Sequence, residues 1–189
     1  MSLKSQIWPA LSLLVLFTLL TGVAYPLLVT GIAQAVFPHQ ANGSLVEAKD
    51  EVVGSRWIGQ VFEDPSLFWG RPSSTGCNAA ASCGSNLGPL NPALAEQVAE
   101  RVKRLREADP SAGGPVPIDL VTTSGSSLDP EISPEAAEYQ VPRVARLRGK
   151  TEQEIRALVR RHTRDRQWGL FGDPGVNVLE LNIELKGLE

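Results

Sequence analysis

The sequence predicts an α+β protein in which a single transmembrane helix precedes one small, loop-rich domain of mixed helices and strands. An almost unbroken apolar run occupies residues 7–35, and no residue with a full formal charge occurs between Lys4 and Glu47. The following residues, 36–189, contain capped helical segments alternating with short β-branched stretches. A chain of this length corresponds to one domain, since domains commonly take about 100 to 200 residues.

The apolar run is long enough to cross a bilayer as a helix. About 20 apolar residues span a hydrocarbon core of roughly 30 Å and satisfy their backbone groups internally. A cleaved signal peptide is an alternative, because Lys4 supplies a basic start and Ala33-Gln34-Ala35 has a small-x-small form. The run is about twice as long as a signal h-region, which favours a retained span. A buried helix of a globular domain fits less well, because the run has no polar face.

The composition of the chain indicates a modest core with long loops. The sequence has 17 glycines, 14 prolines and only 6% aromatic residues, so we expect the domain to need a partner surface to be fully ordered. The 18 basic and 21 acidic residues give no indication of a nucleic-acid partner. Basic residues flank the apolar run almost equally, so charge counting does not decide its orientation.

The two cysteines, Cys77 and Cys83, lie six positions apart. In an oxidising compartment they could close a disulfide, and otherwise they are two free thiols, since spacing alone does not establish the geometry. A zinc site is not expected, because no further cysteine or paired histidine stands nearby.

Three helices are predicted from their capping signals. Asn91-Pro92 and Ser133-Pro134 each place a capping side chain before a proline in the first turn, and Thr151 begins a capping box that ends at Glu154. The first helix ends at Asp109, and Gly149 terminates the second. Pro142 is expected to interrupt the second helix, because an interior proline removes one backbone hydrogen bond.

The sequence predicts a bulged strand or a strand pair at 52–62, a linker and a short strand within 113–122, and a strand at 179–185. The first has β-branched and aromatic residues broken by glycines, and the last alternates apolar and polar residues. The segment 64–92 is rich in Pro, Gly, Ser and Asn, and its embedded Phe68, Trp69 and Leu87 indicate an ordered loop that packs against other residues.

A search for catalytic motifs returns nothing specific. Gly149-Lys150-Thr151 lacks the earlier glycine of a phosphate-binding loop. Ser124, His162 and Asp129 are the residue types of a catalytic triad, but nothing in the neighbouring sequence supports the geometry of one. His162 is expected to continue the apolar stripe of Leu158. The segment 143–166 has nine basic residues against three acidic, which indicates a solvated face or a surface for lipid headgroups or an acidic partner.

Several blocks, in order along nearly the whole chain, are similar to one family. The similarity is carried by 21–28, 41–45, 58–60, 70–73, 84–87, 116–122, 128–130, 139–145 and 176–182. On these residues the chain resembles the C subunit of the Kdp potassium-transporting P-type ATPase, the KdpC family. Cys83 departs from the pattern, because the family commonly has glycine there.

The resemblance implies a non-catalytic subunit of the bacterial inner membrane. Residues 1–6 would be cytoplasmic, 7–35 would span the membrane, and 36–189 would form a periplasmic domain. The implied partners are a channel-like potassium-selective subunit, the P-type ATPase subunit and a small single-helix subunit, together with membrane lipid. No tightly bound cofactor is implied, because the complex handles ATP and potassium.

The resemblance also implies a catalytic chaperone that raises the ATP affinity of the pump subunit, with Gln140 suggested to contact nucleotide. ATP is cytoplasmic, so a domain across the membrane could act on nucleotide affinity only allosterically. The polar loop from Gly70 to Gly88 leads us to expect a domain that docks over the potassium entrance. Its expected partner-facing residues are Phe68, Arg71, Ser85 and Asn86. Direct nucleotide binding and a membrane-tethered hydrolase stay as alternatives.

Overall fold

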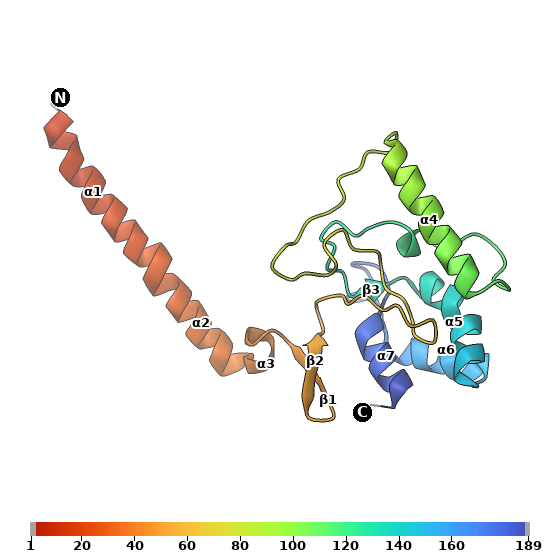
Figure 1. The fold of residues 1–189 in the computed structure, drawn as a ribbon. Coiled ribbons are helices and arrows are strands. Elements are labelled where there is room, and N and C mark those ends of the chain that lie inside the picture. The colour runs from red at the N-terminus through yellow and green to blue at the C-terminus, as the bar shows by residue number, and fades with distance from the viewer. Residues whose placement is uncertain (1–2, 188–189) are drawn as a thin grey trace. The chain divides into compact units, whose positions relative to one another are not determined.

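A computed structural model describes residues 3–187 of the chain. The chain divides into two compact units, Met1–Leu45 and Val46–Glu189, which are described separately here. Figure 1 shows the elements of both units.

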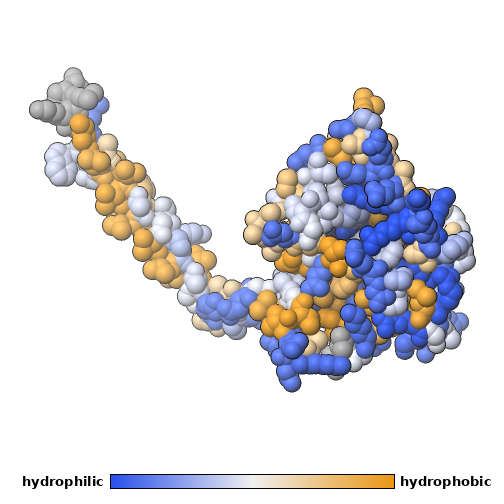
Figure 2. All heavy atoms as spheres, in the orientation of Figure 1, coloured by the Kyte–Doolittle hydropathy of each residue, from blue (hydrophilic) through white to orange (hydrophobic). Residues whose placement is uncertain are grey.

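The first unit is dominated by one long apolar helix. It consists of α1 (Leu3–Leu19), a π-helical turn η1 (Leu20–Ala24) and α2 (Tyr25–Val36). Residues Ser5–Val36 are long and apolar enough to cross a membrane, and most of this helix is coloured as hydrophobic in Figure 2. The predicted span at 7–35 lies inside it, and the helix is somewhat longer at its amino end.

The wide turn in the middle of this helix has a local cause. The Tyr25 N–H donates to Leu20 O, five residues back, and Pro26 follows immediately. A proline ring would clash with the carbonyl four residues earlier in a regular helix, so a widened turn before it relieves the clash. The Thr21 hydroxyl also donates to Phe17 O at 2.6 Å.

The helix ends just after the Ala33-Gln34-Ala35 triplet. Phe37 leaves the helical region, and a short helix α3 (Pro38–Ala41) follows. The side chains of Gln34 and Asn42 exchange two amide hydrogen bonds at 3.2 and 3.3 Å across this turn.

The second unit contains four α-helices and a 3₁₀ turn among its described residues. They are α4 (Pro92–Ala108), η2 (Ile118–Leu120), α5 (Pro134–Arg148), α6 (Glu152–Arg161) and α7 (Val178–Lys186). The capping predictions are confirmed. Asn91 accepts from Ala93 N, Ser133 accepts from Ala136 N, and both bonds of the Thr151 capping box are present.

Two small antiparallel sheets accompany these helices. A two-stranded sheet pairs β1 (Leu45–Ala48) with β2 (Glu51–Ser55), and Lys49 and Asp50 both adopt positive φ in the turn between them. The other sheet has the order β3-β5-β4, with β5 (Gly175–Asn177) between β3 (Glu131–Ile132) and β4 (Thr163–Arg164). All three residues of β5 are buried, as expected for a central strand.

The predicted strand at 179–185 is wrong, because α7 occupies these residues. The Asn177 side chain caps α7 by accepting from Glu180 N, and Gly187 ends it in the left-handed region. The buried positions Val178, Leu181, Asn182 and Leu185 follow helical spacing. Asn182 is buried although it is polar, so the apolar residues of 179–185 alternate with polar ones as in a strand and hide the helical stripe.

Three other expectations are corrected. The segment 113–122 contains the 3₁₀ turn η2 at Ile118–Leu120 instead of the expected short strand, because Pro115 and Pro117 lack the N–H groups that a sheet would need. In 52–62 only the first residues are extended, and β2 ends at Ser55. Pro142 does not interrupt α5, which continues through it to Arg148.

The core lies where α5, α6 and α7 meet the small sheet and a long irregular segment. Its fully buried side chains include Val141, Val144, Ile155 and Leu181. The irregular segment contributes Leu67, Phe68 and Trp69, each no more than 9% exposed. The prediction of an ordered loop around Phe68 and Trp69 is therefore confirmed.

An ion pair crosses the middle strand of the larger sheet. Glu131 of β3 accepts from Arg164 Nε at 3.1 Å and Arg164 Nη2 at 2.7 Å, and Arg164 lies opposite Gly175 in the register of β4 and β5. A Cβ atom at Gly175 would lie 2.5 Å from Glu131 Oε2. The ion pair therefore depends on the missing side chain of Gly175.

We predict that Gly175→Ala lowers the free energy of unfolding by about 1–3 kcal/mol, because the added methyl group displaces Glu131. Urea unfolding of the full chain in detergent, followed by tryptophan fluorescence, measures this. Gly125→Ala is the matched control, since no atom lies within 4 Å of its added Cβ, and it should change stability by less than about 1 kcal/mol. Equal effects of the two substitutions would contradict the prediction.

Candidate functional site

The residues expected to face a partner do not share one environment. Phe68 is fully buried in the core, so its expected exposure is corrected. Arg71 and Ser85 are half-buried, and Asn86 is exposed with a positive φ of 52°. These three belong to the second part of a stretch without helix or strand that runs from 56 to 91, and we call this part, residues 71–91, the docking loop.

The docking loop is held by hydroxyl groups rather than by a backbone ladder. Ser127 is buried, and its hydroxyl donates to Cys83 O at 2.6 Å and lies 2.7 Å from the Ser74 hydroxyl. The Ser73 hydroxyl donates to Ser127 O at 2.8 Å, and Thr123 donates to the Ser85 hydroxyl at 3.0 Å. The segment 123–127 therefore fastens both arms of the docking loop.

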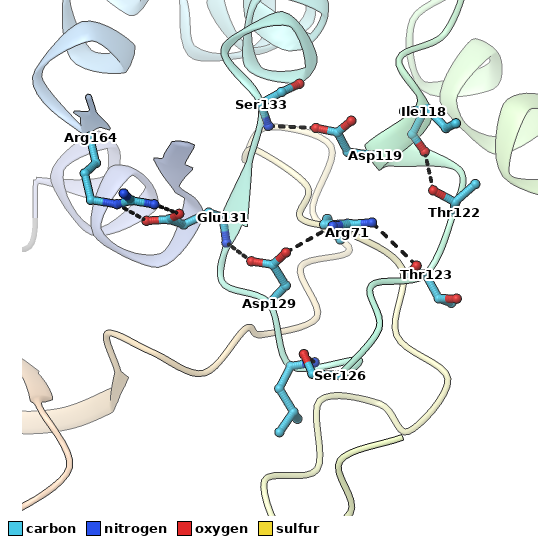
Figure 3. Close-up of polar contacts among 11 residues, drawn as sticks. Arg71, Ile118, Asp119, Thr122, Thr123, Ser126, Asp129, Glu131, Ser133 and Arg164 are labelled. Carbon is cyan, nitrogen blue, oxygen red and sulfur yellow. Dashed lines mark hydrogen bonds and ion pairs between the residues drawn. The ribbon is translucent and has the colours of Figure 1, made fainter. Parts of the chain in front are cut away.

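Arg71 joins the base of the docking loop to the segment before β3. Figure 3 shows its guanidinium between Asp129 and the backbone of Thr123, with an ion pair to Asp129 Oδ2 at 3.1 Å. Asp119 accepts from Ser133 N at 2.7 Å in the same view. Burial raises the pKa of Asp119, but the hydrogen bonds from Ser133 outweigh it, so this pKa lies below its ordinary value.

Cys77 and Cys83 are free thiols in this structure. Cys77 is half-buried with a positive φ of 58°, and its N–H donates to the Ser73 hydroxyl. The Cys83 sulfur accepts a contact from Asn86 Nδ2 at 3.7 Å. The disulfide stays a prediction for an oxidising compartment.

Gln140 lies in the core with both ends of its amide engaged. It is 1% exposed, its Oε1 accepts from Trp69 N at 2.8 Å, and its Nε2 donates to Trp69 O at 3.0 Å and Ala136 O at 3.2 Å. Asn182 binds Phe68 in the same way, accepting from its N–H and donating to its carbonyl, each at 2.9 Å. Two side-chain amides thus replace a strand partner for this segment.

Arg143 completes this arrangement, which we call the polar clamp (Gln140, Arg143 and Asn182). Its guanidinium donates to Gln140 Oε1 at 2.6 Å, to Leu67 O at 3.0 Å and to Pro65 O. Arg143 is 2% exposed, and burial lowers its pKa to about 10, so it stays protonated at neutral pH. A buried cation held by carbonyl and amide oxygens is a positioning group for the segment 65–69.

The other candidate groups are engaged elsewhere. Ser124, His162 and Asp129 do not form a triad, because Asp129 pairs with Arg71 and His162 pairs with Glu184. His162 follows Leu158 by four residues and its side chain is only 16% exposed, which agrees with the expected continuation of the Leu158 stripe. Within residues 3–187, no three His, Cys, Asp or Glu side chains are grouped closely enough to hold a metal ion.

Most of the basic run at 143–166 is paired inside the domain. Five of its arginines have acidic partners: Arg146 with Asp109, Arg156 with Glu138 and Glu152, Arg161 with Glu184, Arg164 with Glu131, and Arg166 with Asp173. The run is therefore not the strong positive surface that its charge count suggests.

The sequence analysis does not identify the roles of Arg143 and Asn182. The burial of Gln140, in contrast, is indicated by its position in the helix. Ala136, Gln140 and Val144 recur at four-residue spacing, so Gln140 falls on the apolar stripe of its helix. A polar residue on such a stripe requires buried hydrogen-bond partners. Nothing local identifies Phe68 and Trp69 as the partners of these amides, because they lie 71 to 114 positions away.

Comparison with known proteins identifies the family. The family model described as "K+-transporting ATPase, c chain" matches residues 7–187. A relative named Potassium-transporting ATPase KdpC subunit from Sorangium cellulosum is 62% identical over 182 residues, which cover 95% of this chain and 96% of the relative. Relatives of the same name from Dechloromonas aromatica and Herpetosiphon aurantiacus are 55% and 58% identical, covering 97% and 94% of this chain and 97% and 93% of the relatives.

The matches cover nearly the whole chain, including the apolar helix, the docking loop and the polar clamp. The chain therefore belongs to the KdpC family, the C chain of the potassium-transporting ATPase.

Proposed function

We propose that the chain is a non-catalytic accessory subunit that anchors itself in the inner membrane and docks its domain over the potassium entrance of a channel-like subunit. The observation that carries this proposal is the docking loop. A long irregular segment fastened by serine hydroxyls around the buried Ser127 is typical of a recognition surface on a rigid scaffold. The family membership supports the assignment to this complex.

The proposal includes assembly with the P-type ATPase subunit and a small single-helix subunit. Any rise in the ATP affinity of the ATPase subunit would act allosterically, through contacts of this chain that differ between two pump states. In this scheme neither ATP nor potassium is bound tightly by this chain itself.

The first test concerns the side of the membrane. Sealed vesicles with the periplasmic face outward should allow added protease to cut residues 46–187, while the apolar helix stays in the membrane after alkaline washing. Vesicles of the opposite orientation are the control and should protect the domain. Cutting only in the inverted vesicles would place the domain in the cytoplasm and contradict the proposal.

The second test concerns the docking loop. Ser127→Leu removes the hydroxyl that binds Cys83 O and Ser74, so we expect a severalfold loss of the other subunits that copurify in mild detergent. Gln153→Leu, exposed on α6, is the matched control and should leave copurification unchanged. Full assembly by a folded Ser127→Leu chain would refute docking through this loop.

Direct nucleotide binding through Gln140 would require breaking its hydrogen bonds to Trp69, Ala136 and Arg143. We predict that Gln140→Ala lowers the free energy of unfolding by about 2–4 kcal/mol, because it leaves Trp69 and Arg143 with unsatisfied buried groups. Urea unfolding measures this, with exposed Gln153→Ala as a control that should change stability by less than about 0.5 kcal/mol.

We also expect no ATP binding by the full chain in detergent at millimolar ATP. ATP binding that is lost in a folded Gln140→Ala chain but kept in the exposed Gln153→Ala control would favour the nucleotide alternative.

A further inference from the structure

A second polar feature lies at the start of the docking loop, where Arg71, Pro72 and Ser73 line a cavity. This cavity of about 240 Å³ opens between α4, the irregular segment at 60–62 and 69–73, and Leu120. Three arginines line it: Arg71, Arg101 and Arg104. Apolar walls come from Phe62 and Leu105, so the three arginine side chains line a surface that is partly shielded from water.

The three arginines have little negative charge to balance them. Arg71 pairs with Asp129 at 3.1 Å, yet its Nε is buried and has no hydrogen-bond partner among the described residues. Arg104 approaches Glu63 only at 3.8 Å, and the Glu63 side chain is 77% exposed, so this surface pair is weak.

Arg101 is held by neutral oxygens. Its Nη1 donates to Val121 O at 2.8 Å and its Nη2 to Gln97 Oε1 at 3.4 Å, and no ion pair of Arg101 occurs within the part of the chain that the structure describes. Burial lowers the pKa of Arg101, and the neighbouring Glu100 offsets this only in part. The cavity thus holds a partly desolvated cation that an anion would stabilise.

The ring of Trp69 contacts two guanidinium groups. The guanidinium of Arg104 lies 4.7 Å from the centre of its ring, and that of the buried Arg143 lies 4.5 Å from it. Both contacts are favourable cation–π interactions, but neither cancels charge. Of the three arginines in the cavity, only Arg71 has a close carboxylate, so two positive charges are in excess.

We propose that this cavity binds a phosphate group, either as free inorganic phosphate or as the phosphomonoester headgroup of a lipid. A phosphomonoester carries about −1.5 to −2 charges at pH 7, which matches the excess better than a single carboxylate does. Guanidinium groups bind such oxyanions through paired N–H donors. The site shares Arg71 with the docking loop, but Arg101 and Arg104 belong to α4, outside that loop, so phosphate binding and docking can be tested separately.

The test is calorimetric titration of inorganic phosphate into the full chain in detergent, at constant ionic strength with acetate as the control anion. Arg101→Gln and Arg104→Gln should each weaken phosphate binding by about tenfold or more, because each removes a charged contact. Lys103→Gln is the matched control, because Lys103 lies on the same helix, is highly exposed and does not line the cavity. Thermal unfolding confirms that each variant is folded. Arg104, about half exposed, keeps the test usable if Arg101→Gln fails to fold.

The source of the phosphate is distinguished by repeating the titration in nanodiscs. Weaker binding of inorganic phosphate in discs with phosphatidic acid than in discs of phosphatidylcholine alone identifies the lipid headgroup, and equal binding identifies free phosphate. Three results would overturn the proposal: no phosphate binding at about 10 mM, ten times a millimolar Kd; equal binding by the original chain and both arginine variants; or acetate binding as tight as phosphate binding.

Discussion

The domain depends on the polar clamp that fixes an irregular segment in its core. Leu67, Phe68 and Trp69 are buried without a strand partner, so their backbone groups would be unsatisfied if Gln140, Asn182 and Arg143 did not bind them. A buried backbone group without a hydrogen bond costs about 1–3 kcal/mol. The clamp thereby lets a loop-rich chain bury a phenylalanine and a tryptophan that its short strands could not cover.

The clamp also positions the surface features that follow it in the chain. The Trp69 N–H donates to Gln140 of the clamp, and its carbonyl accepts from the same side chain. The centre of the Trp69 ring lies 4.7 Å from the Arg104 guanidinium, and Arg71 begins the docking loop two residues later. The clamp holds the segment that leads into the docking loop, so the hydroxyl network around Ser127 needs to order only the residues from Ser73 onward. Such preorganisation lowers the entropy lost when a partner or an anion binds.

The sequence predicts features whose physical causes are local, and it misses those that depend on distant residues. The helix starts at Asn91, Ser133 and Thr151 follow from side chains that cap the next turn, so they are read correctly. The apolar helix follows from its length and composition. The helix α7 was mistaken for a strand because Asn182, a member of its buried stripe, binds a segment 114 positions away.

The same limit applies to the candidate site. Family resemblance indicated Gln140 as important but not that it is buried, and the cavity of Arg71, Arg101 and Arg104 forms only when a helix and a loop from separate parts of the chain meet. The charge count of the run at 143–166 indicates a solvated face or a surface for lipid headgroups or an acidic partner, but most arginines of this run pair with carboxylates of the same domain.

The π-helical turn at Leu20–Ala24 has a consequence for how the apolar helix meets its surroundings. A π-turn adds one residue to a helical circuit, so side chains after Ala24 are rotated by about 100° relative to the phase of an uninterrupted α-helix. The stripes before and after the turn are therefore out of register. A neighbouring helix that packs along α1 can continue along α2 only by crossing to another face. The apolar helix therefore offers two separate packing surfaces, one before and one after the π-turn.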